Sequence, residues 1–459
     1  MTTPELRTPQ QQPEVEHGDR CERFCIIGAG PSGLGAARAL KQAGIPFDVI
    51  ERQHDVGGIW NGDSGRTPMY ESAHFISSKT QSAFSNFPMP ESYPDYPGWR
   101  QILHYLRSFA VEHDLRRHIE LGIEVERATP SDAGWDVRLS SGETRRYRGL
   151  IIAAGHQWMP RTPGYRGTFD GEAYHSFHYR SANQLREKRV LIVGGGNSGC
   201  DIACDAAANA RQAWISLRRG YYFLPKHIFG KPTDLFFRSG PELPTWLAQP
   251  LLTVLLRVFV GDLSRLGLQR PDHKVLESHP IVNSQLLHYL AHGDITAKPD
   301  VAELQGKRVR FVDGSEVEVD VIIWAIGYQL AFPFLDDGII SATSPMADLA
   351  SGVLHRRHSN LYVLGLFETD GGAYPVISRQ AELVARAIRA REANGVGARK
   401  LESLIRQSPN LSGGVRYLRS PRHAISVQYE AYMHHLDRVI ASLPPVSAVR
   451  PMASAIPRA

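Results

Sequence analysis

Short apolar runs and a helical stretch alternate at the start of the chain. Phe24–Ile27 is an apolar run, Leu34–Gln42 has apolar residues at helical spacing, and Phe47–Ile50 is a second run. The glycine-rich segment Gly28-Ala29-Gly30-Pro31-Ser32-Gly33 lies between the first run and the helix. A strand, a tight turn and a helix in this order place backbone N–H groups at a pyrophosphate, and Glu51 after the second strand suits ribose hydroxyls. The pattern predicts a dinucleotide-binding unit.

The same order returns near the middle of the chain. Arg189–Val193 and Trp214–Leu217 are apolar runs on either side of the helical stretch Cys200–Ala208, and the first leads into Gly194-Gly195-Gly196-Asn197-Ser198-Gly199. Here Arg218-Arg219 follow the second run, where the first unit has an acid. A guanidinium binds the 2'-phosphate of NADPH through paired hydrogen bonds, whereas a carboxylate repels it. This unit is predicted to bind NADPH, with a solvated basic turn as the alternative role of the arginines.

Composition and charge exclude several classes of protein. Apolar residues make up 42% of the 459 residues and charged residues 22%, which is ordinary for a globular protein. The net charge of +5 is small, and no Lys/Arg run is interleaved with aromatics, so we expect no nucleic-acid partner. Residues 1–20 are polar and do not resemble a secretory signal, which favours the cytoplasm. The Cys-x3-Cys pairs Cys21/Cys25 and Cys200/Cys204 predict reduced thiols and no metal site.

One apolar stretch stands out within the second unit. Trp246–Val260 is interrupted by Gln249, Pro250 and Arg257 and is shorter than a bilayer span. We therefore expect no membrane contact, although the stretch fits either a buried helix or an interfacial patch. It belongs to a region, residues 221–292, that is rich in Phe, Leu and Pro and suits either an apolar substrate entrance or ordinary core packing.

The segment between the two glycine-rich loops carries a family motif. Residues 169–180, Phe-Asp-Gly-Glu-Ala-Tyr-His-Ser-Phe-His-Tyr-Arg, resemble the sequence F-x-G-x-x-x-H-x-x-x-Y of flavin-containing monooxygenases. Baeyer-Villiger relatives usually carry Trp at the position of Tyr179, so the resemblance favours oxygenation of heteroatoms. His175 of the motif is expected to link the two dinucleotide-binding domains rather than to catalyse.

The resemblance extends over most of the chain and implies its domain organisation. Leu150–Gly155, Asp320–Tyr328 and Asn360–Gly365 are apolar strands that end at or near glycine, and such strands return the chain to the flavin domain in the family. The implied fold is α/β, with two Rossmann-like dinucleotide-binding domains and the NADPH domain inserted into a discontinuous FAD domain. The expected bounds are 21–165 and 326–443 for the FAD domain, 166–325 for the NADPH domain, and flexible segments at 1–20 and 444–459.

The pattern and the resemblance together give two sets of cofactor contacts. A glycine pair followed by a large aromatic, Gly57-Gly58-Ile59-Trp60, suits a backbone that passes close to a flat cofactor, with ordinary turn chemistry as the alternative. The expected FAD contacts are Gly28, Ala29, Gly30, Pro31, Ser32, Gly33, Glu51, Gly58, Ile59, Trp60, Ser77, Val125 and Gln380. The expected NADPH contacts are Gly194, Gly196, Asn197, Ser198, Gly199, Arg218, Arg219 and Asn283, of which Asn283 rests on the resemblance alone. Gln380 precedes a helix expected at residues 381–391, and residues 429–443 are expected to form a closing helix.

One position departs from the family. The segment 70–79 resembles the stretch that supplies an active-site asparagine, and the matching residue here is Ile76. In the family that amide helps to hold the nicotinamide cofactor and the flavin hydroperoxide. Either Ser77, Ser78 or another group replaces the amide, or the peroxide is less protected. No catalytic residue is assigned for this reason.

The implied activity is that of an NADPH-dependent flavin monooxygenase. By resemblance, NADPH reduces FAD, oxygen adds to form a C4a-hydroperoxyflavin, and a nitrogen or sulfur of a small lipophilic substrate takes the distal oxygen. The alternatives are Baeyer-Villiger or other carbon oxygenation, an uncoupled NADPH oxidase, and a protein whose FAD reports redox state to a partner. The expected partners are therefore the substrate and O2, and a homodimer is left open.

Overall fold

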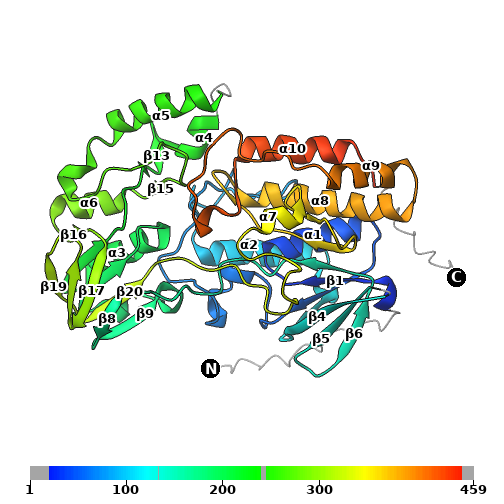
Figure 1. The fold of residues 1–459 in the computed structure, drawn as a ribbon, viewed down its shortest axis with the longest axis horizontal. Helices are drawn as coiled ribbons and strands as arrows, with labels where there is room; N and C mark the ends of the chain where they lie inside the picture. The colour runs from blue at the N-terminus through cyan, green and yellow to red at the C-terminus, as the bar shows by residue number, and fades with distance from the viewer. Residues whose placement is uncertain (1–19, 133, 239–243, 447–459) are drawn as a thin grey trace, which may run out of the picture.

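The computed structural model describes residues 20–132, 134–238 and 244–446. The flexible segments expected at 1–20 and 444–459 lie outside the described residues, apart from Arg20 and residues 444–446. Two mostly parallel sheets organise the described chain, and each contains the strands of one glycine-rich unit (Figure 1).

The first sheet contains strands from both ends of the chain. Its order is β21 (Leu349–Ala350), β22 (Leu354–His355), β23 (Leu361–Val363), β7 (Gly149–Ile152), β1 (Phe24–Ile27), β2 (Phe47–Glu51) and β3 (Ile119–Leu121). The five strands from β23 to β3 are parallel, and the two at the other edge are antiparallel. Since β23 follows the entire second unit in sequence but pairs with β7, this domain is discontinuous.

Both faces of the first sheet are covered. Phe24 and Ile26 of β1 pack in the core shared with the helices α1 (Pro31–Gln42), α2 (Trp99–Glu112), α8 (Ala373–Glu392), α9 (Val396–Ile405) and α10 (Tyr429–Ala441). Cys25 and Ile27 face the antiparallel strands β4 (Val125–Ser131), β5 (Gly134–Leu139) and β6 (Thr144–Tyr147). Burial on both faces explains why the strand reads as an unbroken apolar run.

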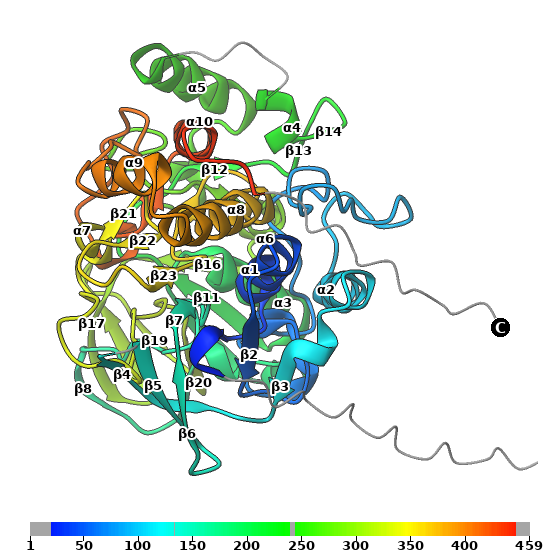
Figure 2. The same ribbon diagram turned by 90° about the vertical axis from the view of Figure 1, so that its right-hand side faces the viewer.

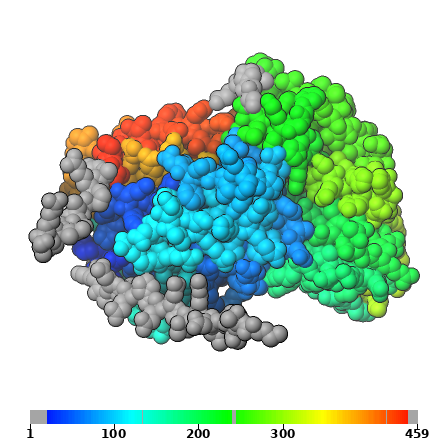
Figure 3. Space-filling model, turned by 180° about the vertical axis from the view of Figure 1, so that it is seen from behind, coloured from blue at the N-terminus to red at the C-terminus, as the bar shows by residue number. Residues whose placement is uncertain are grey.

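The second sheet repeats this plan within residues 166–324. Its order is β16 (Ile295–Lys298), β11 (Gln212–Ser216), β10 (Arg189–Val193), β20 (Val321–Trp324) and β9 (Glu172–His175), all parallel. One face packs on α3 (Asn197–Asn209) and α6 (Gln285–His292). The other packs on the sheet of β19 (Glu316–Glu318), β18 (Arg308–Phe311), β17 (Val301–Gly306) and β8 (Arg166–Phe169). The predicted fold class, two Rossmann-like domains with one inserted into the other, is confirmed. On the face seen in Figure 3, the middle of the chain (green) lies to one side of the blue and orange segments from its two ends.

Elements between β11 and α6 lie above the second sheet in the view of Figure 1. They include β12 (Phe223–Leu224), β13 (His227–Ile228), β14 (Lys231–Pro232), α4 (Thr233–Arg238), α5 (Thr245–Phe259) and β15 (Ile281–Val282). Short elements elsewhere are α7 (Pro345–Asp348), β24 (Glu368–Thr369) and β25 (Ser426–Val427). Helix α5 lies at the outer edge of the molecule in two perpendicular views (Figures 1 and 2). The sequence left a buried helix and an interfacial patch as alternatives for this stretch. The structure excludes the buried helix, because Leu256 is the one buried residue of α5.

Helix α8 is longer than the sequence predicts. It begins at Ala373, not at Ala381. Pro375 is compatible with this start because it occupies the first turn, where a missing N–H costs no hydrogen bond.

Over the residues that the structure describes, no helix combines the length and apolar character needed to cross a bilayer. The four cysteines all lie in described parts of the chain and form no disulfide.

Candidate functional site

The first glycine-rich loop leaves no room for side chains. Gly28 has φ +103°, and a Cβ there would lie 2.7 Å from the carbonyl oxygen of Ala153. A Cβ on Gly33 would lie 1.8 Å from the carbonyl oxygen of Gly28, so α1 packs directly against the turn. Gly30 is the N-cap of α1, and the helix N-terminus faces a cavity. This is the geometry of a loop that accepts a pyrophosphate.

Glu51 ties this loop to the end of β2. Its carboxylate accepts hydrogen bonds from the backbone N–H of Ala29 at 2.6 Å and of Gln53 at 2.9 Å. Burial raises the pKa of Glu51, and these two backbone donors oppose the shift. The same side chain lines the cavity, so it stands where a ribose hydroxyl would reach it.

The second loop has the same close packing but one open position. Gly194 has φ +116°, and a Cβ on Gly199 would lie 2.1 Å from the carbonyl oxygen of Gly194. A Cβ on Gly196, in contrast, would meet no atom within 4 Å. Next to it, the side-chain oxygen of Asn197 is buried and has no hydrogen-bond partner in the described structure. An open backbone position and an orphaned acceptor fit a ligand with a hydroxyl or amide donor beside a phosphate.

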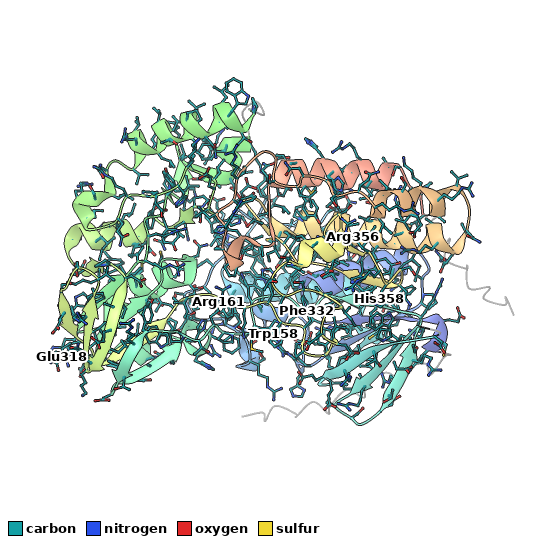
Figure 4. The ribbon with its side chains drawn as sticks, viewed as in Figure 1. Trp158, Arg161, Glu318, Phe332, Arg356 and His358 are labelled. Carbon is teal, nitrogen blue, oxygen red and sulfur yellow. The ribbon has the colours of Figure 1, made fainter. Side chains whose placement is uncertain are left out.

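Three arginines gather near this second loop. Arg219 forms an ion pair with Asp272 at 3.3 Å, whereas Arg218 is exposed and forms no ion pair with any described residue. Arg161 comes from the connection between the domains and donates from Nε to the carbonyl of Tyr328 at 2.8 Å (Figure 4). Burial lowers the pKa of Arg161, and the charge of Arg218 lowers it further. An anion bound between Arg161 and Arg218 would relieve the repulsion of their like charges.

Helix α3 carries two acids that accept hydrogen bonds from the first domain. Asp201 accepts from the hydroxyl of Tyr70 at 2.9 Å and from the amide of Asn283 at 2.9 Å. Burial raises the pKa of Asp201 to about 6, against the hydrogen bonds from Tyr70 and Asn283, which lower it. Asp201 lines the cavity, but Asn283 does not, and its amide oxygen accepts from the N–H of Leu286 at 2.9 Å. The structure thus places Asn283 behind Asp201, where it orients that carboxylate.

Asp205 makes a second link one turn further along α3. It accepts from the hydroxyl of Ser72 at 2.6 Å and from the hydroxyl of Tyr179 at 2.8 Å. Tyr179 matches the tyrosine that ends the motif F-x-G-x-x-x-H-x-x-x-Y, and its ring is fully buried. His175 of the same motif contacts the carbonyl of Gly327 at 3.0 Å, at the return crossover. His175 thus connects the second domain to the first, whereas Tyr179 holds Asp205 within the second domain, and both contacts are architectural.

A cavity of about 1340 Å³ joins the two loops. The expected FAD contacts that line it are Gly28, Gly30, Pro31, Ser32, Glu51, Gly58, Ile59, Trp60, Ser77 and Val125, and the expected NADPH contacts that line it are Asn197 and Ser198. Those that do not line it are Ala29, Gly33, Gln380, Gly194, Gly196, Gly199, Arg218, Arg219 and Asn283. Part of the wall is apolar and comes from α5, through Leu251, Leu252 and Leu255. The cavity thus has a polar, loop-lined end and an apolar end.

The segment that lacks the family amide lies on the cavity wall. Ile76 lines the cavity and is 48% exposed. Ser77 also lines it, but its hydroxyl is engaged with the hydroxyl of Ser82 at 2.6 Å. Ser78 does not line it, since its N–H donates to Asp234 at 2.6 Å and its hydroxyl is buried without a partner. Of the two serines, only Ser77 can reach a ligand in this cavity.

Gln380 serves the fold of α8 and not the cavity. It is fully buried, and its amide oxygen accepts from the N–H of Gly365 at 2.9 Å. Its amide nitrogen donates to the hydroxyl of Tyr432 at 2.8 Å. Its side-chain oxygen and nitrogen thus both have partners inside the protein.

Sequence patterns missed other groups of the site. Arg161 belongs to no motif and contacts the carbonyl of Tyr328, at the return crossover, only through the fold. His279 and Glu368 line the cavity and approach each other to 3.7 Å from opposite domains. Only the pairing of residues so far apart in sequence could have indicated them, and a single sequence does not contain that information.

The chain is similar to known proteins over nearly all of its length. The sequence model described as "Flavin-binding monooxygenase-like" matches residues 21–450. "Dimethylaniline monooxygenase [N-oxide-forming] 2" of Rattus norvegicus is 31% identical over 398 residues, which cover 80% of this chain and 73% of that protein. "Probable indole-3-pyruvate monooxygenase YUCCA9" of Arabidopsis thaliana is 33% identical over 321 residues, which cover 67% and 75%.

Solved structures with this fold include "Oxidized steroid monooxygenase bound to NADP". It superposes with a TM-score of 0.71 at 19% identity and covers 92% of this chain and 98% of its own. "Crystal structure of Tmm from Pelagibacter sp. strain HTCC7211" superposes with a TM-score of 0.64 at 20% identity, covering 91% and 86%. At such identities the structures establish the fold alone.

Proposed function

We propose that this chain, which belongs to the flavin-binding monooxygenase-like family, oxygenates a nucleophilic nitrogen or sulfur of a small lipophilic substrate. It is a FAD- and NADPH-dependent monooxygenase, and O2 and an oxidisable substrate are its partners. The observation that carries the finer proposal is the cavity of about 1340 Å³, whose loop-lined end suits dinucleotides and whose other end is apolar.

FAD is proposed to lie along the first loop. The tight turn at Gly28 and the N-terminus of α1 would hold its pyrophosphate, Glu51 would accept from its ribose, and Gly58 to Trp60 would contact the ring system. When reduced by NADPH, FAD supplies the oxygen-activating chemistry, through the C4a-hydroperoxyflavin that the family resemblance implies.

NADPH is proposed to lie along the second loop. The open position at Gly196 would admit its pyrophosphate, and Asn197 would accept a hydrogen bond that it lacks within the protein. The 2'-phosphate would lie between Arg218 and Arg161, with Arg219 already neutralised by Asp272. We propose the domain bounds stated from the sequence, 21–165 with 326–443 and 166–325, and a cytoplasmic location.

The protein's own residues have three tasks in this proposal. Asp201 and Asp205 keep the second domain at a fixed distance from the segment that holds Ile76. Leu251, Leu252 and Leu255 give the substrate end an apolar wall, which excludes water. The substrate needs no acid or base, because a soft nitrogen or sulfur nucleophile attacks directly.

A second candidate is an uncoupled NADPH oxidase, and Ile76 favours it. The side chain on the cavity wall has no amide to hold the oxygenated flavin, and Ser77 has its hydroxyl committed to Ser82. Such an enzyme would consume NADPH and release H2O2 with every substrate. Carbon oxygenation is a third candidate activity. Tyr179 disfavours it, because Baeyer-Villiger relatives usually carry Trp at this position.

The decisive experiment separates these candidates in one preparation. The holoenzyme is reduced with NADPH without oxygen, mixed with O2, and followed by rapid-scanning absorbance, with and without a panel of amines, thioethers and ketones. Heteroatom oxygenation predicts an N-oxide or sulfoxide in a near-stoichiometric ratio to NADPH. Ester or lactone products would contradict the proposal in favour of carbon oxygenation, and H2O2 equal to NADPH for every compound would favour the oxidase.

A further inference from the structure

Helix α5 presents a continuous apolar face to solvent. At 100° per residue, positions 246, 247, 250, 251, 254, 257 and 258 fall on one side of the helix. Trp246 is 75% exposed, Val254 60% and Val258 73%, and Leu247 and Leu251 on the same side are also exposed. The helix lies at the outer edge of the molecule (Figure 2). A large apolar face of this kind marks a contact surface.

The turn between β13 and β14 extends this face. Phe229 is 81% exposed, and its ring lies 5.9 Å from that of Phe259 at the end of α5 and 6.0 Å from that of Phe236 in α4. We call the exposed side of α5 together with Phe229 the α5 face. Its rings lie beside aliphatic side chains, a composition typical of helices that lie in a lipid interface.

The charges around the α5 face are basic. Arg257 lies on the exposed side of α5, and Lys231 follows the turn at Phe229. Neither forms an ion pair with any residue that the structure describes. The nearby acid Asp262 is bound by Arg270 at 2.6 Å, so its charge is compensated. The two uncompensated cations complement an anionic headgroup layer.

The opposite side of the same helix lines the cavity. Ala248, Leu252 and Leu255 contribute to the cavity wall from the inner side of α5. Leu251 belongs to both sides, because it lines the cavity and is also 45% exposed. The apolar end of the cavity therefore reaches the surface at the edge of the α5 face.

We propose that the α5 face docks on the surface of a lipid bilayer that contains anionic headgroups, so that apolar molecules pass from the membrane into the cavity beside Leu251. Helix α5 is 15 residues long and contains Pro250, so it lies in the interface and does not span the bilayer. A second copy of the chain fits this face less well, because it would cover the opening at Leu251 and bring Arg257 and Lys231 near the same cations of its partner. This proposal departs from the expectation of no membrane contact and takes up the interfacial patch, which was one of the two alternatives for residues 246–260.

The test is co-sedimentation of the FAD-loaded enzyme with vesicles, without NADPH or substrate. One set is phosphatidylcholine alone, and the other contains about 30% phosphatidylglycerol. The variant Val254→Glu/Val258→Glu places two acids on the α5 face, and the expected loss of binding is at least about tenfold. The control Val312→Glu/Val396→Glu adds the same charge at valines that are 64% and 74% exposed elsewhere, and it should bind as the wild type does.

A second pair of measurements tests the charges. Lys231→Gln and Arg257→Gln should each weaken binding to the anionic vesicles by about fivefold and leave binding to the neutral vesicles unchanged. Val254, Val258, Lys231 and Arg257 are all exposed and do not line the cavity. Flavin content and thermal midpoint should therefore stay at the wild-type values in the variants of these residues. Absence of wild-type binding to both vesicle sets, or equal binding of the two double-glutamate variants, overturns the proposal. A dimer in sedimentation that only Val254→Glu/Val258→Glu dissolves, without vesicle binding, would assign the face to self-association instead.

Discussion

Replacing Arg218 with Ala should separate the two nicotinamide cofactors. Arg218 is exposed at the end of the second unit and has no ion-pair partner among the described residues, so it is available to the 2'-phosphate. Charge-assisted hydrogen bonds contribute about 1.5–3 kcal/mol. After solvent screening at an exposed site, we expect kcat/KM for NADPH to fall about 10- to 100-fold.

The neighbouring arginines provide the controls for this prediction. Arg219 is held by Asp272 at 3.3 Å, so Arg219→Ala should cost less than Arg218→Ala. The charge of Arg218 lowers the pKa of Arg161, so both side chains are expected at the phosphate. Arg161→Ala should therefore also weaken the binding of NADPH. In the double variant Arg161→Ala/Arg218→Ala, the two losses of binding free energy should not add.

The assay is anaerobic flavin reduction followed by absorbance, with NADPH and NADH titrated in parallel. The kcat/KM for NADH should change by less than about twofold in all three single variants, because NADH carries no 2'-phosphate. An equal loss for both cofactors in Arg218→Ala would refute the assignment of the phosphate site.

Three further predictions concern the second glycine-rich loop, the cavity wall at Ile76 and Asp201 of helix α3. Gly199→Ala places a Cβ 2.1 Å from the carbonyl of Gly194 and should destabilise the fold by about 1–3 kcal/mol in urea unfolding, whereas Gly196→Ala should keep the wild-type midpoint and raise only the KM for NADPH. A shared fall in stability would contradict the open position at Gly196. Ile76→Asn restores the family amide on the cavity wall and should lower the H2O2 released per NADPH, measured by a peroxidase-coupled assay; an unchanged ratio would mean that the amide is not what limits coupling. Burial raises the pKa of Asp201 to about 6 from its ordinary value, so its ionisation penalises the folded state, with no penalty below about pH 4 and the full penalty above about pH 6. Asp201→Asn should therefore gain stability relative to wild type between pH 4 and 7, by about 1–3 kcal/mol, and a constant difference across that range would show that the carboxylate does not titrate there.

The frame of the fold could be predicted because its strands are buried on both faces. β1 and β10 read as unbroken apolar runs next to glycine-rich turns, and both are found at the expected residues. Glu51 was identifiable because its role depends on distance along the chain from the loop. The start of α8 was not, because Pro375 normally signals the end of regular structure, and only the position in a first turn makes it compatible with a helix.

The site was less predictable where its parts come from different domains. Asn283 and Gln380 were expected as cofactor contacts, but the structure gives their amides to Asp201 and Tyr432 inside the protein. Arg161 was not expected, because its relation to Arg218 exists only after both domains fold. A polar side chain in a family-like stretch thus predicts a role near the site but does not determine which partner it takes.

Helix α3 connects the two halves of the reaction. Its N-terminus is the Gly196–Asn197 end of the second loop, and its acids Asp201 and Asp205 hold Tyr70 and Ser72 of the flavin domain. The chain runs from Ser72 to the cavity wall at Ile76. A ligand that moved the start of α3 would therefore also move the segment next to the proposed flavin ring, unless the carboxylate–hydroxyl hydrogen bonds of Asp201 and Asp205 broke. Tyr179 donates to the same carboxylate at 2.8 Å from within the second domain, so it holds Asp205 in place for the contact with Ser72.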